Sequence, residues 1–192
     1  MPAYQKIVQM INFFAKKNEL EQISKIIVLK LIFFADRYHM RKYGSMISND
    51  EYWAMTYGRV PSTAKTITEL SVSDPDIMEY VKTFLRKGKK FIVKSIAPVD
   101  NDQFSKSEIE AMEYAFSLFM SVGNIVELTH TLPEWKKHEK FLVSIHSRRK
   151  MDPCDFFSHI KGDDYSGNIP ADHLNMAEEI FRENKLIQSW LA

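Results

Sequence analysis

KLIFFADRYHMRKYGSMISNDEYWAMTYGRVP, residues 30–61, joins the end of a strongly apolar pattern to a run of polar and aromatic residues. The pattern begins near Leu20, and only three residues between positions 23 and 35 are polar. At helical spacing it carries two apolar lines on roughly opposite sides of one helix. These lines are Ile23, Ile27, Leu31, Phe34 and Tyr38, and Leu29, Ile32 and Phe33. A helix that is apolar on two sides lies inside a bundle. We therefore predict a central buried helix that ends at Gly44, a residue suited to the left-handed C-terminal position.

Polar residues then extend the second apolar line, where burial would otherwise continue. Asp36 and His39 are three residues apart on one helical face, so the carboxylate could orient the imidazole, or both could bind a metal. Further ligands would come from His130, His138 or His146. The alternative is a partly buried, hydrogen-bonded pair near the helix C-terminus. We favour this alternative and predict no metal and no cofactor, because no established metalloenzyme spacing is present.

The remaining chain predicts an α+β fold that is mainly α, a compact helical domain with a small antiparallel β-sheet. Hydrophobic periodicity and caps, such as the capping box Ser105-x-x-Glu108, predict several further helices. Helices are expected over residues 3–17, 61–70, 74–88, 105–122 and 124–130, within 153–160, and from 172 onward. Strands are expected over residues 50–57, 91–97 and 141–147, and the first two are expected to pair.

Length and composition limit the number of domains, the partners and the cellular compartment that we expect. The 192 residues, 45% of them hydrophobic, are most simply one domain over residues 1–192, and we expect no further domain before its first helix. A net charge of +1 gives no strong field for gathering nucleic acid, which argues against nucleic acid as a partner. Cys154 is the only cysteine, which fits a reducing cytoplasm. No run approaches the about 20 apolar residues of a membrane span, so we expect no membrane contact.

Several segments of the sequence resemble one known family. KLIFFADRYHMRKYG and then DEYWAMTYGRVP, in residues 30–61, are similar to the signature of the Panacea domain, the family of SocA-like antitoxins. Further on, Ser105 to Glu110 and HTLPEW, residues 130–135, resemble its later helix and its His-then-Trp segment. One departure is Arg59, where the family commonly has proline, and this departure bears on the rigidity of the turn.

The resemblance implies an antitoxin, not an enzyme, which neutralises a cognate protein toxin by direct binding in the cytoplasm, as in phage defence. One class of family members instead acts as a proteolytic adaptor that delivers its bound toxin to a cytoplasmic protease. We expect the C-terminal end of the central helix, the turn at residues 57–61 and the segment 130–135 to contribute to partner binding. The candidate residues are Asp36, Arg37, His39, Arg41, Tyr57, Arg59, His130 and Trp135. The competing interpretation is that these segments only hold the framework together.

Two other classes stay open on the sequence. A metal-dependent enzyme would centre on Asp36, His39 and His130. A nucleic-acid-binding protein could stack bases on the aromatic residues near Trp53, although packing within the sheet is the simpler role for them. Cys154 and His159 match no protease signature, and the sequence contains no phosphate-binding loop or nucleophile elbow.

Overall fold

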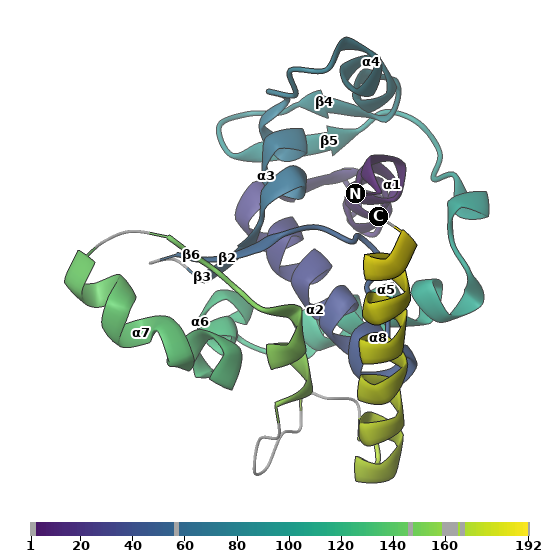
Figure 1. Cartoon of the computed structure of the whole chain (residues 1–192). Coiled ribbons are helices and arrows are strands. Elements are labelled where there is room, and N and C mark those ends of the chain that lie inside the picture. Colours follow the sequence, from purple (N-terminus) through teal and green to yellow (C-terminus); the bar gives the residue numbers. More distant parts are fainter. Residues whose placement is uncertain (1–2, 56–57, 146–147, 159–164, 166–167, 192) are drawn as a thin grey trace.

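The centre of the molecule is the helix α2, Lys25–Tyr43. A computed structural model of the chain describes residues 3–55, 58–145, 148–158, 165 and 168–191. Every side chain of α2 from Val28 to Arg41 is buried, and most of the other helices pack around it (Figure 1). The predicted central helix is therefore confirmed. Its predicted start near Leu20 is wrong, because residues 22–24 form a strand.

The helices around α2 come from both ends of the chain. α1 precedes α2 and is buried along its whole inner side, from Ile7 to Ala15. α5 and α8 pack along α2. α3 and α6 pack near the N-terminal half of α2 and against the β-hairpin formed by residues 52–61. The helical bounds are α1 Tyr4–Lys16, α3 Ser62–Glu69, α4 Pro75–Phe84, α5 Lys106–Ser121, α6 Ile125–Thr131, α7 Pro133–Ile145 and α8 Ala171–Leu191, with the 3-10 turns η1 Asn101–Gln103 and η2 Pro153–Phe157.

The strands form two antiparallel sheets within the described residues. One has the order β1-β5-β4 and the other β3-β2-β6. Trp53 pairs with Val60 in the β2–β3 hairpin, and with Lys150 on the other side. The predicted pairing of the strand at Tyr52 with residues 91–97 is therefore wrong, because those two strands belong to different sheets. The bounds are β1 Gln22–Ser24, β2 Tyr52–Met55, β3 Gly58–Pro61, β4 Leu85–Lys87, β5 Ile92–Ser95 and β6 Arg149–Lys150.

Local capping explains where several of the helices begin or end. Ser105 and Glu108 form the predicted capping box at the start of α5. Asn124 accepts hydrogen bonds from the first backbone amides of α6, and Asp74 does the same for α4. Gly44 ends α2 with φ 72°, and a Cβ at this position would lie 2.6 Å from the backbone oxygen of Ala177. Gly44 therefore provides both the left-handed turn and the close approach of α8.

The segment after α6 differs from the prediction. Residues 141–145, expected in a strand, continue the helix α7, and residues 146–147 lie outside the described residues. Glu134, Trp135, His138 and Leu142 are buried on its inner side, and successive turns of the helix supply them at intervals of three or four residues. That spacing is helical, so the β-branched and aromatic residues of the segment are a weaker signal than its periodicity. Within the described ranges, every helix is too short or too polar to span a membrane.

Candidate functional site

One polar face of α2 is organised around the Asp36 carboxylate, which is fully buried. Oδ1 accepts hydrogen bonds from the backbone amides of Ile47 and Ser48 at 2.8 and 3.0 Å. Oδ2 accepts from the Ser48 hydroxyl and from the Tyr52 hydroxyl, the latter at 2.7 Å. Burial raises the pKa of Asp36, and these four hydrogen bonds act against that rise. Asp36 therefore fixes the loop after α2 and the first residue of β2.

The predicted Asp36–His39 pair does not form. The ring nitrogens of His39 lie 2.7 Å from the carbonyl oxygen of Ser45 and 3.1 Å from the hydroxyl oxygen of Ser107. His39 therefore joins α2 to the start of α5, while Asp36 is bonded elsewhere. In the part of the chain that the structure describes, no group of three or more His, Cys, Asp or Glu side chains is placed to hold a metal ion.

The opposite face of α2 carries three buried cations. Lys30, Arg37 and Arg41 are separated by seven and four residues and so share one side of the helix. Lys30 donates to the carbonyl oxygen of Arg59 at 2.8 Å, and Arg41 donates to that of Phe156 at 2.7 Å. Each cation therefore connects α2 to a different neighbouring segment, and the interval between them is the sequence signal that could have revealed this face.

Glu134, the second residue of α7, is the acid that balances part of this charge. Its Oε1 accepts from Arg37 Nε at 2.8 Å, and its Oε2 lies 3.4 Å from Arg59 Nη2. The three side chains are 0–1% exposed. The Arg59 guanidinium also lies 4.4 Å from the centre of the Phe33 ring. Arg59 thus occupies a buried place between α2 and α7, stabilised by an ion pair and a cation–π contact.

Burial shifts the ionisation of these cations. The pKa of Lys30 is lowered to about 7, first by burial and then by the nearby Arg59 charge. The pKa of Arg59 is lowered to about 10, mainly by burial, and Glu134 opposes this shift. Gly58 has a φ of 95°, and a Cβ there would lie 2.6 Å from Lys30 Nζ. A side chain at this position would therefore collide with the buried ammonium group.

His130 and Trp135 lie together, as their sequence proximity suggested. Their rings stack with centroids 4.5 Å apart and an interplanar angle of 27°. The Trp135 indole is buried, and its Nε1 donates to the carbonyl oxygen of Met55 at 3.2 Å. Trp135 therefore joins α7 to the end of β2, which is the role that the framework interpretation gives it.

Most residues predicted to contact a partner are buried, and their bonds hold α2, α7 and the β2–β3 hairpin together. Whether a partner contacts any of them stays a prediction. Asp36, Arg37, His39, Arg41, Arg59 and Trp135 are at most 7% exposed, His130 is partly buried, and Tyr57 lies outside the described residues.

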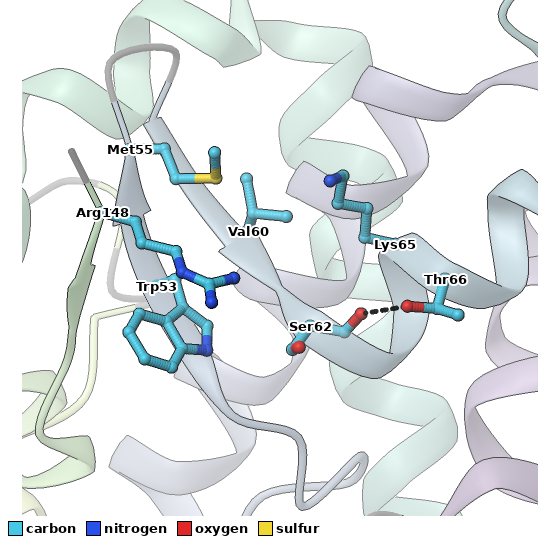
Figure 2. A pocket seen from close by; sticks show the side chains of 7 residues that line it. All are labelled: Trp53, Met55, Val60, Ser62, Lys65, Thr66 and Arg148. Atoms are coloured by element: carbon cyan, nitrogen blue, oxygen red, sulfur yellow. Dashed lines mark hydrogen bonds between the residues drawn. The ribbon is translucent and has the colours of Figure 1, made fainter. Parts of the chain in front are cut away.

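The outward face of the same hairpin is open and concave. Burial alternates along β2, so Tyr52 and Ala54 point inward while Trp53 and Met55 point outward. Val60, opposite Trp53 in the register, shares the outward face. Figure 2 shows the Arg148 guanidinium beside the Trp53 indole, 4.7 Å from the ring centre. These residues, together with the first turns of α3, line a small pocket of about 130 Å³.

A larger cavity of about 580 Å³ adjoins this pocket and shares Met55, Val60 and Lys65 with it. Its other walls come from the first turns of α2, from α3 and from the tip of the β4–β5 hairpin at Phe91. We call the two connected spaces the outer groove. Its residues are Ser24, Lys25, Ile26, Leu29, Trp53, Met55, Val60, Ser62, Lys65, Thr66, Thr68, Glu69, Phe91 and Arg148.

The outer groove was not predicted from the sequence as a unit. The outward position of Trp53 follows from strand alternation, but the groove combines segments far apart along the chain, from Ser24 to Arg148. Ile26 is an apolar residue at the start of α2, but its exposure, which marks it as part of a surface, follows only from the fold.

Comparison with known proteins places this geometry in a family. A family model described as "Antitoxin SocA-like, Panacea domain" matches residues 28–136, more than half of the chain. The matched region includes most of α2, the β2–β3 hairpin, α3 and the first turn of α7. Searches of curated proteins and of solved structures found no match.

Proposed function

Because the chain belongs to the family of SocA-like antitoxins with a Panacea domain, we propose that it neutralises a cognate protein toxin by binding it directly. The match over residues 28–136 is the observation that carries the proposal. It covers the segments that build the buried polar framework and much of the outer groove. A rigid framework that presents a concave, partly apolar surface suits a protein whose task is binding.

The proposal assigns the chain a binding role and no catalytic one. The Asp36 carboxylate already accepts four structural hydrogen bonds. A carboxylate engaged in this way is not available to bind or activate a substrate. We place the protein in the cytoplasm, where a toxin made in the same cell would be met, and we expect a role in phage defence.

Growth of a bacterial host tests the proposal. The reading frame next to the gene for this chain would be expressed alone and together with the chain. We expect its product to stop growth when expressed alone, and growth to return on co-expression. Absence of rescue by a chain that is folded, as judged by circular dichroism, would contradict the proposal.

A second arm of the same experiment separates direct neutralisation from the adaptor mechanism. Co-expression would be repeated in hosts that lack individual cytoplasmic ATP-dependent proteases, and the toxin level would be followed by immunoblotting. Direct binding predicts unchanged rescue with the toxin still present. An adaptor predicts that rescue disappears with one protease and that toxin accumulates there. We favour direct binding, because bound toxin needs no further component to be held inactive.

A further inference from the structure

The outer groove is a largely apolar hollow at the surface, and its apolar side chains remain in contact with water. Phe91 is 65% exposed and Ile26 is 43% exposed. Met55 on β2 and Val60 on β3 are only partly buried, although their neighbours Ala54 and Arg59 are fully buried. Exposed apolar residues gathered around one hollow are typical of a binding surface, whereas isolated ones are ordinary.

The charges on the rim indicate the chemistry of the partner. Lys25, Lys65 and Arg148 contribute three positive charges to the walls, against one negative charge from Glu69. Lys65 and Glu69 are 3.8 Å apart and both about half exposed, so they neutralise each other only weakly. An occupant with apolar side chains on one face and carboxylates beside them would complement both the floor and the rim.

The backbone of β3 restricts how such an occupant binds. A partner could add a strand only to an edge whose carbonyl and amide groups are available. The carbonyl oxygen of Arg59 already accepts a hydrogen bond from Lys30 Nζ, and β2 covers the other edge of β3. The free edge of β3 is therefore a poor template for an added strand, and the groove is better suited to side-chain contacts of the kind that an amphipathic helix makes.

We propose that the outer groove binds an amphipathic helical segment of the toxin, with aspartate or glutamate residues flanking its apolar face. This inference rests on the proposed function and adds the surface and the chemistry of recognition. Apolar side chains of the segment lie against Ile26, Met55, Val60 and Phe91, and its carboxylates lie near Lys25 and Lys65. Nucleic acid fits less well, because the apolar floor offers its phosphates no partner and the three cations form no continuous track.

Replacement of Ile26 by glutamate tests the inference. Ile26 is the second residue of α2, where an acidic side chain is favoured by the helix dipole, so the variant should fold. The affinity of the purified variant for the purified product of the adjacent toxin reading frame would be measured by biolayer interferometry. We expect Ile26→Glu to weaken binding at least about tenfold, since it places a desolvated carboxylate against apolar and acidic groups of the partner.

The matched control is Ile187→Glu. Ile187 lies on α8 and is 47% exposed, close to the 43% of Ile26, among other exposed apolar residues of that helix. We expect Ile187→Glu to bind and rescue growth like the parent. If Ile187→Glu loses binding while Ile26→Glu keeps it, the partner docks on α8 and the inference is wrong.

A charge pair of variants tests the acidic character of the segment. Lys65→Glu should weaken binding about three- to tenfold and reduce the dependence of affinity on salt. Lys106→Glu, at the first position of α5 near the opposite end of α2, should change neither. Lys65→Glu also serves if Ile26→Glu does not fold, because the Lys65 side chain is half exposed.

The outcomes separate the inference from the proposed function. Failure of the parent chain to bind or rescue overturns both. If the parent rescues growth and the folded variants Ile26→Glu and Lys65→Glu rescue it equally well, the groove inference is wrong and the proposed function stands. Binding that nuclease treatment abolishes would identify nucleic acid as the occupant. Self-association that Ile26→Glu abolishes, with toxin binding retained, would identify a second copy of this chain. Each of these last two results also overturns the inference.

Discussion

Replacement of Glu134 by glutamine should destabilise the folded chain by about 3–5 kcal/mol, because it leaves buried guanidinium groups without their counter-charge. Glu134 contacts Arg37 at 2.8 Å and Arg59 at 3.4 Å, and all three side chains are 0–1% exposed. Glutamine keeps the volume and one acceptor oxygen, so the lower end of that range is expected. Against a typical total of about 5–15 kcal/mol the loss is large.

Urea unfolding at pH 7, followed by circular dichroism, measures the effect. A loss of about 3 kcal/mol should lower the midpoint by roughly 1–3 M for an m value of about 1–3 kcal/mol per molar. The matched control is Glu178→Gln, which removes an ion pair to Arg182 of 2.6 Å on the surface of α8. That change should cost no more than about 0.5 kcal/mol. Equal midpoints for the two variants would refute the view that Glu134 holds a buried charge cluster.

Three further measurements test the framework. The pKa of Lys30 in the folded chain is about 7, below its ordinary 10.5, so between these values the unfolded chain binds a proton that the folded chain lacks. The free energy of unfolding should therefore rise with pH over that window, by up to about 1.4 kcal/mol per pH unit, and Lys30→Met should remove this contribution. Equal slopes of unfolding free energy against pH for the parent and Lys30→Met, measured by urea titration from pH 7 to 9, would contradict it. Leu31→Ala and Phe34→Ala should each cost about 2–5 kcal/mol, because both side chains are at most 1% exposed, and a melting temperature unchanged within error for both would show that α2 is not the core. Elemental analysis should find no stoichiometric metal, since both oxygens of Asp36 are already engaged, and about one zinc or manganese per chain that disappears in Asp36→Ala and His39→Ala would contradict this.

The local features of the fold could be predicted from the sequence because interactions between residues close together in the chain determine them. The two apolar lines of α2, the capping box at Ser105 and the left-handed Gly44 each depend on residues within a few positions. Strand pairing could not be predicted in this way. β1 is three residues long and pairs with β5, about 70 residues later, so its segment continues the helical pattern of α2 when examined alone.

The candidate site could be predicted in part. The residues at 36, 37, 39, 41 and 59 were expected to contact a partner, which stays a prediction, and their burial depends on segments elsewhere in the chain. Arginine is a common residue at interfaces, so Arg37 and Arg59 suggested partner contacts from the sequence. Only the fold shows that Glu134 lies between them as a buried counter-charge. The outer groove depends even more on tertiary structure, because it combines α2, α3 and two hairpins.

Hydrogen exchange of the chain with and without the purified toxin tests direct binding through the outer groove. The backbone amides of the first turns of α2, of α3 and of the β2–β3 hairpin should exchange more slowly in the complex, because the bound segment covers them. The outer side of α8 should be unchanged. Protection confined to α8, or no protection at a toxin concentration that saturates binding to the chain, would contradict the account.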